Sequence, residues 1–356
     1  MCFTILGNQI ARPFTMNNIQ NIVSIDEYSM TPKYLQLINS ILDGIQSGEI
    51  KKHDLLPSIN ELSCTLETAR STIERAYNEL KRMGLVTSVA GKGYFIAQTS
   101  YIRPTKILLL FNKLSIHKKM IYDAFAATLG NEGAIDFYIY NNDYKLFKKI
   151  LEDKAGCYQK CVIIPNFNED KDLGYELIDS LPKKKLILMD KLAHGISGNF
   201  GAVYEDFEND IFSALQQLAH RLHKYHTLKL VFPHNTYHSK KIIQGLRRFC
   251  RQYDLKHEIL NCLQEEQIES GCVYINLVED DLVMLIEKMI EGKFKVGKDV
   301  GLISYNEIPI KKIILDGITT ISTDFTLMGA KTAELILQNS VERIAVPFKV
   351  TVRNSL

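Results

Sequence analysis

The sequence predicts two kinds of domain in one chain: a small α+β domain of three helices and a hairpin, followed by a larger two-lobed α/β domain with parallel sheets. Two observations predict this division. Residues 32–95 carry three amphipathic helix signals and then two short strand signals around Gly91-Lys92-Gly93. Beyond residue 105, strand-like runs alternate with amphipathic stretches, which is typical of parallel sheets covered by helices.

Length and composition fit a soluble protein of two or three domains. The chain has 356 residues, of which 46% are hydrophobic and 24% are charged, and its formal net charge is +2. Its seven cysteines include no C-x-x-C pair, which suits reduced thiols, and no run approaches the ~18 apolar residues of a membrane span. We expect a cytoplasmic protein with no membrane partner. Residues 1–27 are expected to be a poorly structured extension, with Met16 an alternative native start to Met1.

The helices of the first domain have recognisable beginnings and ends. An apolar stripe over residues 32–46 predicts the first helix. Ser58 and Glu61 are spaced as a capping box and open a second helix. Thr68 is the expected N-cap of a third helix, which ends at Met83-Gly84.

The third helix and the hairpin after it together indicate DNA binding. The helix begins with small polar and basic side chains and has an apolar rear, as major-groove entry requires. Residues 70–93 hold five Lys/Arg against two Asp/Glu, a local excess that attracts phosphate. The glycines of Gly91-Lys92-Gly93 allow the hairpin tip to approach the DNA backbone closely. Residues 28–97 therefore predict a winged helix-turn-helix domain whose partner is double-stranded operator DNA.

This first domain resembles the GntR family of bacterial transcription factors over about residues 31–97. The resemblance rests on Leu56-Pro57-Ser58, Arg70-x-Thr72, Gly84-Leu85 and Gly91-x-Gly93-Tyr94-Phe95. It implies DNA contacts from the second helix, the start of the third helix and the wing glycines. With neighbouring polar and basic residues added, the predicted DNA-binding set is Ser58, Asn60, Arg70, Ser71, Thr72, Glu74, Arg75, Lys92 and Gly93.

Three departures from the family pattern concern a turn, the second helix and the recognition helix. His53 stands where a turn glycine is usual, and Asn60 and Glu74 occupy positions that are often arginine. Arg70 can still contact guanine, which is worth ~1–3 kcal/mol of discrimination. Glu74 either accepts from cytosine N4 or pairs within its helix with Asn78 or Arg70. We expect an operator unlike that of better-known relatives.

A polar stretch over residues 98–105 is the expected linker to the second domain, residues 106–356. Parallel sheets of this kind hold ligands at the carboxyl ends of their strands. The predicted strands are Lys106–Phe111, Ile135–Tyr140, Cys161–Pro165, Lys185–Met189, Ala202–Tyr204, Leu228–Phe232, Val273–Asn276 and Val300–Ser304.

The second domain resembles the effector domain of the lactose-repressor family, which is built like a periplasmic sugar-binding protein. Residues 300–307 and 318–329 carry the resemblance most strongly, and it extends over about residues 105–356. It implies two lobes, a small-molecule site between them and dimerisation through the effector domains.

A sugar site needs hydrogen-bonding side chains and an aromatic face at the strand ends. The family resemblance supports Asp190, Asn306, Asp324 and Phe325, although each polar strand-end residue is alternatively a helix cap. Ile242 stands where relatives often carry a sugar-binding arginine, for which Lys240 or Lys241 is a substitute. The predicted ligand-binding set is Asn112, Lys113, Ser115, Asp190, Lys191, Lys240, Glu279, Asn306, Asp324 and Phe325.

The sequence predicts no metal, cofactor or catalytic residue. Cys157-x3-Cys161 lacks a matching second pair, and His220-x2-His223-x2-His226 is interpreted as a solvated helix end. No Gly-x-Ser-x-Gly, Walker or Gly-x-Gly-x-x-Gly loop is present.

We therefore predict a homodimeric, sugar-responsive DNA-binding regulator, which represses a carbohydrate-utilisation operon and is released by a monosaccharide. The chain resembles Bacteroides-type regulators that sense L-fucose or L-arabinose. One alternative is a GntR-type regulator that senses a non-sugar metabolite. Another is a cytoplasmic small-molecule-binding or enzymatic α/β protein.

Overall fold

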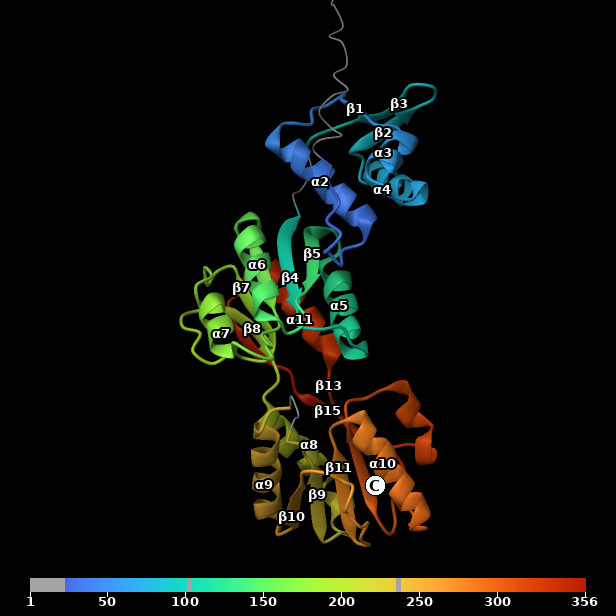
Figure 1. The fold of residues 1–356 in the computed structure, drawn as a ribbon, viewed down its shortest axis with the longest axis vertical. Helices are drawn as coiled ribbons and strands as arrows, with labels where there is room; N and C mark the ends of the chain where they lie inside the picture. Colours follow the sequence, from blue (N-terminus) through green and yellow to red (C-terminus); the bar gives the residue numbers. More distant parts are fainter. Residues whose placement is uncertain (1–22, 101–103, 235–237) are drawn as a thin grey trace, which may run out of the picture. The chain divides into compact units, whose positions relative to one another are not determined.

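The computed structural model describes residues 23–100, 104–234 and 238–356 (Figure 1). Most of the predicted N-terminal extension, with both candidate start positions, lies outside the described residues, as do three residues of the predicted linker. In the described part, Val23 is buried in the core of the first domain and the backbone N–H of Asp26 donates to Gln36 at 2.8 Å.

The chain divides into two compact units. One contains the residues up to 114 together with 129–177, and the other contains 115–128 together with 178–356. The first unit includes the small N-terminal domain and three of the strands that follow it, Thr105–Phe111, Gly133–Ile139 and Lys160–Ile163. In the described part of the chain, none of the helices has both the length and the apolar character to cross a membrane.

In the described residues, the N-terminal domain has three helices and a three-stranded antiparallel sheet of order β1-β3-β2, as predicted for a winged helix-turn-helix. Ile41, Ile73 and Leu80 are fully buried in its single apolar core. The elements are α2 (Lys33–Ser47), β1 (Leu55–Leu56), α3 (Ile59–Thr65), α4 (Arg70–Arg82), β2 (Val86–Val89) and β3 (Gly93–Ile96).

Of the two predicted helix N-caps, one is confirmed and the other is wrong. The predicted capping box is confirmed, because Glu61 N donates to Ser58 Oγ at 3.2 Å and Ser58 N donates to Glu61 Oε2 at 2.8 Å. The predicted Thr68 cap is wrong: α4 begins after Ala69, which has no capping side chain. The Thr68 hydroxyl instead donates to the Leu66 carbonyl at 2.9 Å, so it stabilises the turn between the helices.

Two turns of this domain require left-handed backbone. His53 has a φ of +72°, so the position at which glycine is usual adopts a glycine-like conformation here as well. Gly91 and Gly93 at the hairpin tip have φ values of +72° and +104°. These glycines form the sharp wing that the sequence predicts.

The first large sheet has the strand order β14-β8-β7-β6-β4-β5, so that β5 lies at an edge. The strand pairs β4–β5, β4–β6, β7–β8 and β14–β8 are parallel. Its elements are β4 (Thr105–Phe111), α5 (Ile116–Leu129), β5 (Gly133–Ile139), α6 (Tyr144–Lys154), β6 (Lys160–Ile163), α7 (Lys171–Asp179), β7 (Leu186–Asp190), β8 (Gly201–Tyr204), α11 (Phe325–Leu337) and β14 (Arg343–Ala345).

The second large sheet has the order β10-β9-β11-β12-β13-β15, and only β15 runs antiparallel to its neighbour. Its elements are α8 (Phe207–Leu222), β9 (Thr227–Val231), α9 (Lys241–Tyr253), β10 (Lys256–Leu260), β11 (Cys272–Asn276), α10 (Glu279–Glu291), β12 (Gly301–Tyr305), η3 (Pro309–Lys312), η4 (Ile314–Asp316), β13 (Thr319–Thr323) and β15 (Phe348–Thr351).

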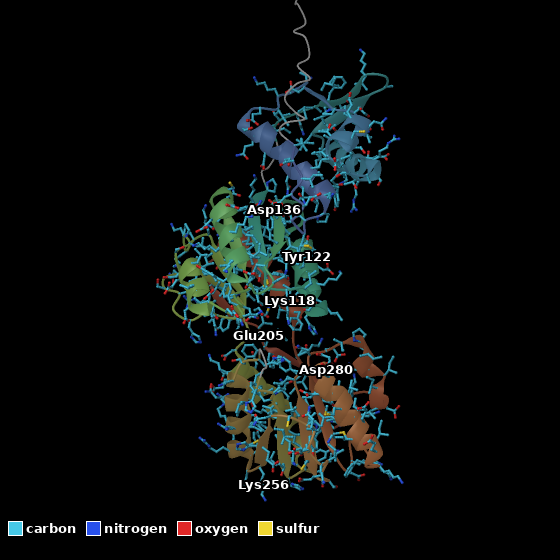
Figure 2. All side chains as sticks on the ribbon, in the orientation of Figure 1. Lys118, Tyr122, Asp136, Glu205, Lys256 and Asp280 are labelled. Carbon is cyan, nitrogen blue, oxygen red and sulfur yellow. The ribbon has the colours of Figure 1, made fainter. Side chains whose placement is uncertain are left out.

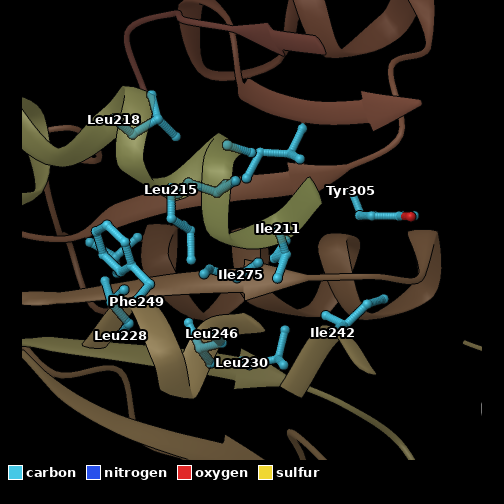
Figure 3. Packing of buried hydrophobic residues seen from close by; sticks show 14 of the residues in the cluster. Ile211, Leu215, Leu218, Leu228, Leu230, Ile242, Leu246, Phe249, Ile275 and Tyr305 are labelled. Carbon is cyan, nitrogen blue, oxygen red and sulfur yellow. The ribbon is translucent and has the colours of Figure 1, made fainter. Parts of the chain in front are cut away.

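Helices α8 and α9 cover one face of the second sheet over a large apolar core (Figure 3). Ile211 and Leu215 of α8 pack in the same cluster as Leu228 of β9. A Cβ on Gly245 of α9 would lie 2.0 Å from Ile211 Cγ2 and 2.4 Å from the Glu208 carbonyl oxygen. Glycine is therefore needed at this position for the two helices to pack so closely.

The predicted fold class is confirmed, and all eight predicted strands occur within two residues of their expected bounds. The strands β10, β13, β14 and β15 were not among those predicted. Lys256, His257 and Glu258 make the edge strand β10 polar and exposed, while Thr and Ser dominate β13, so neither has an apolar run.

Candidate functional site

The predicted DNA-contacting residues lie on two surfaces of the N-terminal domain, the start of α4 with the adjacent α3 and the hairpin tip. Arg70, Ser71 and Glu74 are exposed on the first two turns of α4, and Thr72 is half-buried. Ser58 caps α3, and Ser58 and Asn60 are both exposed. Lys92 and Gly93 are exposed at the tip between β2 and β3. The opposite side of α4 carries buried residues that pack into the apolar core.

The basic side chains of this domain differ in the contacts that they form within the protein. The guanidinium of Arg75 lies 3.8 Å from the Tyr34 ring centroid and donates to the Tyr34 hydroxyl at 3.1 Å. Arg82 pairs with Glu79 on its own helix. Arg70 and Lys92 form no ion pair within the described residues, so their charges are available to a partner.

Glu74 has no hydrogen bond or ion pair with Asn78 or Arg70 in the part of the chain that the structure describes. The intrahelical alternative is therefore not realised in the free protein. An exposed carboxylate here remains available to a base edge such as cytosine N4.

At the effector end, Asp190 closes β7 and its Oδ2 accepts from Lys118 Nζ at 2.9 Å. Lys118 lies on the first turn of α5, and its side chain is only 9% exposed. Figure 2 labels Lys118 together with Glu205, which follows β8. The backbone N–H of Glu205 donates to the Asp190 carbonyl at 3.0 Å, and its carboxylate accepts from the Thr323 hydroxyl.

Burial and neighbouring negative charges in this cluster favour the protonated forms of its acidic groups. Burial of its carboxyl group, and after that the nearby Asp190 carboxylate, raise the pKa of Glu205 well above its ordinary value. Burial and the Asp206 carboxylate raise the pKa of Asp210 to about 7. Tyr305 is buried in the same region, and burial raises the pKa of its phenol. Carboxylic acids held neutral can donate as well as accept hydrogen bonds.

An aromatic pair lies at the same end of α5, where His117 is next to Lys118 in the sequence. The ring centroids of His117 and Phe325 are 4.7 Å apart, and His117 Nε2 is buried without a hydrogen-bond partner among the described residues. Burial, above all, lowers the pKa of His117, although Glu279 opposes this shift. A neutral imidazole beside a phenyl ring provides both an apolar face and one polar atom for a ligand.

Polar atoms without partners also gather at the carboxyl ends of β11 and β12. Asn276 Oδ1, Ser304 Oγ and Asn306 Oδ1 are buried and have no hydrogen-bond partner within the described residues. Asn276 and Ser304 are direct neighbours in the strand register. The fully buried Lys311 donates to the carbonyls of Tyr305 and Asn306, both at 2.8 Å. Buried polar atoms normally have partners, so these atoms mark a place where a polar ligand would be stabilised.

Asp190, Asn306, Glu279 and Phe325 all belong to the second compact unit, as does Lys240. Glu279 Oε1 lies 3.8 Å from Lys311 Nζ, whereas Lys240 is exposed at the start of α9.

Several predicted ligand-binding residues form hydrogen bonds with backbone groups close to them in the chain. Asp324 accepts from Leu327 N at 2.9 Å and so caps α11, while Ser115 Oγ accepts from Lys118 N at 3.2 Å at the start of α5. Lys191 N donates to the Met189 carbonyl at 2.9 Å in the turn after β7. Asn112 and Lys113 belong to the other compact unit, where Asn112 Nδ2 donates to Asn142 Oδ1 at 2.8 Å.

The missing sugar-binding arginine has a structural explanation. Ile242 is fully buried in the apolar core between α8, α9 and the second sheet. An arginine at this position would place its charge in that core. The residues that sequence reasoning missed are His117, Lys118, Glu205 and Lys311, although the first two directly follow the predicted Ser115.

No group of three or more His, Cys, Asp or Glu side chains in the described residues is arranged to hold a metal. His226 lies next to Thr227 Oγ1 at 2.9 Å and the Ser270 carbonyl at 3.2 Å, beyond the end of α8 at Leu222.

Comparison with known proteins identifies the N-terminal domain. The profile described as "Bacterial regulatory proteins, gntR family" matches residues 33–96. The HTH-type transcriptional repressor YtrA of Bacillus subtilis (strain 168) is 30% identical over 100 residues, which are 28% of this chain and 73% of that repressor. The chain belongs to the GntR family of bacterial regulatory proteins. The predicted resemblance is thereby confirmed.

Two further comparisons concern the rest of this GntR-family protein. The arabinose metabolism transcriptional repressor of Geobacillus stearothermophilus is 34% identical over 67 residues, which are 19% of this chain and 18% of that repressor. The crystal structure of the lac repressor dimer bound to operator and the anti-inducer ONPF has a TM-score of 0.57 at 13% identity, covering 71% of this chain and 94% of that one. The two-lobed α/β domain thus has a lac-repressor-like fold, and these relatives are regulators rather than enzymes.

Proposed function

We propose that this GntR-family regulator is a repressor that binds double-stranded operator DNA as a homodimer and is released by a monosaccharide. Residues 28–97 bind DNA, residues 98–105 are the linker, and residues 106–356 bind the effector and dimerise. The observation that carries the effector proposal is the row of buried polar atoms without partners at the ends of β11 and β12, beside the His117–Phe325 ring pair. Sugars present both hydroxyls and an apolar ring face, which match these two features.

For DNA recognition, the recognition helix is α4. Arg70 reads guanine, Glu74 accepts from cytosine N4, and Ser71 and Thr72 contact the backbone or base edges. Lys92 at the wing supplies phosphate attraction. The remaining proposed contacts are Ser58, Asn60, Arg75 and Gly93.

For effector recognition, Asn306 and the Asp190–Lys118 pair supply polar contacts and Phe325 the apolar face. The other proposed contacts are Asn112, Lys113, Ser115, Lys191, Lys240, Glu279 and Asp324. L-Fucose and L-arabinose are the first candidates, since the resemblance to regulators of monosaccharide use favours them. Because Ile242 replaces the sugar-binding arginine of relatives, a non-sugar metabolite is the competing candidate.

Two measurements test this proposal separately. Fluorescence anisotropy with a duplex from upstream of the protein's own gene should show binding that weakens steeply with salt. Thermal-shift screening should find one monosaccharide that raises the melting temperature, since a ligand at ~100 times its Kd adds ~2.7 kcal/mol of stability. Absence of salt-sensitive DNA binding sinks the regulator proposal. If no pentose, hexose or deoxyhexose raises the melting temperature, the monosaccharide proposal fails and the non-sugar metabolite is left as the alternative.

A further inference from the structure

A segment that precedes the DNA-binding helices forms hydrogen bonds with the edge strand of the first sheet. Strand β5 lies at this edge, where its backbone groups would otherwise lack partners. Residues 26–31, which we call the clasp, run along it. Met30 N donates to the Phe137 carbonyl at 2.7 Å, and Ser29 Oγ donates to the same carbonyl at 3.3 Å. The clasp therefore pairs with β5 much as an added strand would.

Thr31 provides the bonds that a backbone would make in a longer strand. Its Oγ1 accepts from Phe137 N at 2.8 Å and donates to the Ile135 carbonyl at 3.3 Å. Thr31 is buried, at 3% exposure, so the bond from Phe137 N is shielded from water and the bond to Ile135 is partly so. One hydroxyl thus satisfies a donor and an acceptor of the sheet edge.

The other end of the clasp is attached by an ionised carboxylate. Asp26 Oδ2 accepts from Lys154 Nζ of α6 at 2.7 Å and from the Tyr138 hydroxyl of β5 at 2.9 Å. Although burial disfavours the charge, these hydrogen bonds outweigh it and hold the pKa of Asp26 below its ordinary value. Asp26 therefore ties the clasp to both a strand and a helix of the effector lobe.

On its opposite side the clasp is attached to α2 by Gln36. The Gln36 amide donates to the Thr31 carbonyl at 2.8 Å and to the Asp26 carbonyl at 3.3 Å, and its oxygen accepts from Asp26 N at 2.8 Å. Gln36 is 7% exposed. Helix α2 in turn packs against the recognition helix α4 in the same apolar core. A continuous set of contacts thus leads from β5 to the DNA-reading helix.

A second connection runs in parallel. Asp136, labelled in Figure 2, accepts from the Tyr158 hydroxyl at Oδ2 over 2.8 Å and from Asn39 Nδ2 of α2 at Oδ1 over 3.5 Å. Lys106 of β4 forms an ion pair with Asp43, also on α2. Helix α2 is therefore held to the sheet from its own side as well as through the clasp.

We propose that the clasp couples the two functions of the chain: operator binding at α4 and the conformation of strand β5 are linked through Thr31 and Gln36. Thr31 and Gln36 are positioning residues, since neither lies on the DNA face. The inference rests on the proposed DNA-binding function. Because coupling free energies are reciprocal, a conformation of β5 that favours operator binding is itself stabilised by bound DNA, and by the same free energy. This allows a test that needs no effector.

The test measures hydrogen exchange of the full chain with and without a short duplex from upstream of its own gene, at low salt. In the wild type, DNA should slow amide exchange in residues 133–140 by about fivefold or more, the lower end of common allosteric couplings. Thr31→Val keeps the side-chain shape but removes both hydroxyl bonds, so the DNA-dependent change should disappear while DNA affinity is retained. Thr31→Ser keeps the hydroxyl and should behave as the wild type.

A second variant guards against a folding artefact. Gln36→Leu removes the hydrogen bonds between the clasp and α2 but leaves the contacts of the clasp with β5. This variant should likewise abolish the DNA-dependent change, and circular dichroism should confirm that it is folded. The inference is overturned if Thr31→Val retains the DNA-dependent change, or if wild-type protein binds DNA with no change at residues 133–140. If the wild type binds no DNA at all in the anisotropy control, the proposed function fails and the inference fails with it.

Discussion

Lys118 and Asp190 form an ion pair of 2.9 Å that joins the first turn of α5 to the end of β7, with the lysine side chain only 9% exposed. Asp190 also lies beside Glu205, whose carboxyl has a raised pKa because it is buried and because Asp190 is charged. The lysine thus offsets negative charge at the point where the ligand is proposed to bind. Its removal leaves a carboxylate with no compensating cation, which is costly in a shielded site.

Lys118→Met should therefore destabilise the fold by ~3 kcal/mol, the lower range for breaking a buried pair. The matched control is Lys119→Met on the same helix, because Lys119 is 73% exposed and its pair with Asp123 lies at the surface. That change should stay within ~0.5 kcal/mol. Urea denaturation of the two variants measures the difference, and equal losses would show that the ion pair at Asp190 is not what stabilises this region.

Asp210 should make stability depend on pH. Its pKa is raised to about 7 by burial and by Asp206, whereas an unfolded aspartate titrates near its ordinary value. The protonated form is favoured in the fold, so its contribution is fully present below the unfolded pKa and is lost as pH rises through about 7. Asp210→Asn should then raise the melting temperature at pH 8 relative to wild type and have little effect at pH 4. An identical shift at both pH values contradicts this assignment.

Gly245→Ala should be strongly destabilising. The new Cβ would lie 2.0 Å from Ile211 Cγ2 and 2.4 Å from a backbone oxygen of Glu208, so α8 and α9 must move apart at a cost of ~1–3 kcal/mol or more. Gly156→Ala is the control, since nothing lies within 4 Å of its Cβ position. Thermal unfolding should separate the two variants clearly. A tolerated Gly245→Ala would mean that the helix pair packs less closely than the structure has it.

Arg70 and Lys92 should have different effects on DNA binding. Arg70→Ala should cost ~1–3 kcal/mol and relax specificity at one guanine, because a bidentate base contact is lost. Lys92→Ala should weaken all sequences alike and reduce the slope of log affinity against log salt by about one. Arg251→Ala, an exposed change on α9, serves as the control. Salt titrations on operator and unrelated duplexes distinguish the two roles, and a uniform loss in Arg70→Ala would argue against base reading.

Much of the fold was predictable because its signals are local. The stripe of α2, the Ser58–Glu61 capping box and the paired glycines of the wing all depend on residues a few positions apart, where helix and turn geometry determine which atoms meet. Thr68 was misassigned because a hydroxyl can bond either to a helix end or to its own turn, and the sequence does not distinguish these.

The candidate site was only partly predictable. Residues at the strand ends, such as Asp190 and Asn306, could be named because parallel sheets place those ends at one edge. The charges around them could not, since Lys118 comes from α5, far from Asp190 in the chain, and Glu205 reaches Asp190 only because β7 and β8 pair in the sheet. The clasp was missed for the same reason, because Thr31 and Phe137 have no sequence relationship that indicates their pairing.

The sequence by itself determined the GntR-type DNA-binding domain, the alternating α/β architecture and the placement of polar residues at strand ends. All of these follow from short-range periodicity and turn chemistry. Only the tertiary structure decided that Ile242 belongs to the apolar core, that Lys118 neutralises Asp190, and that residues 26–31 cover the edge of β5. Burial and charge compensation depend on which distant segments share a small volume, and that is a property of the packed chain alone.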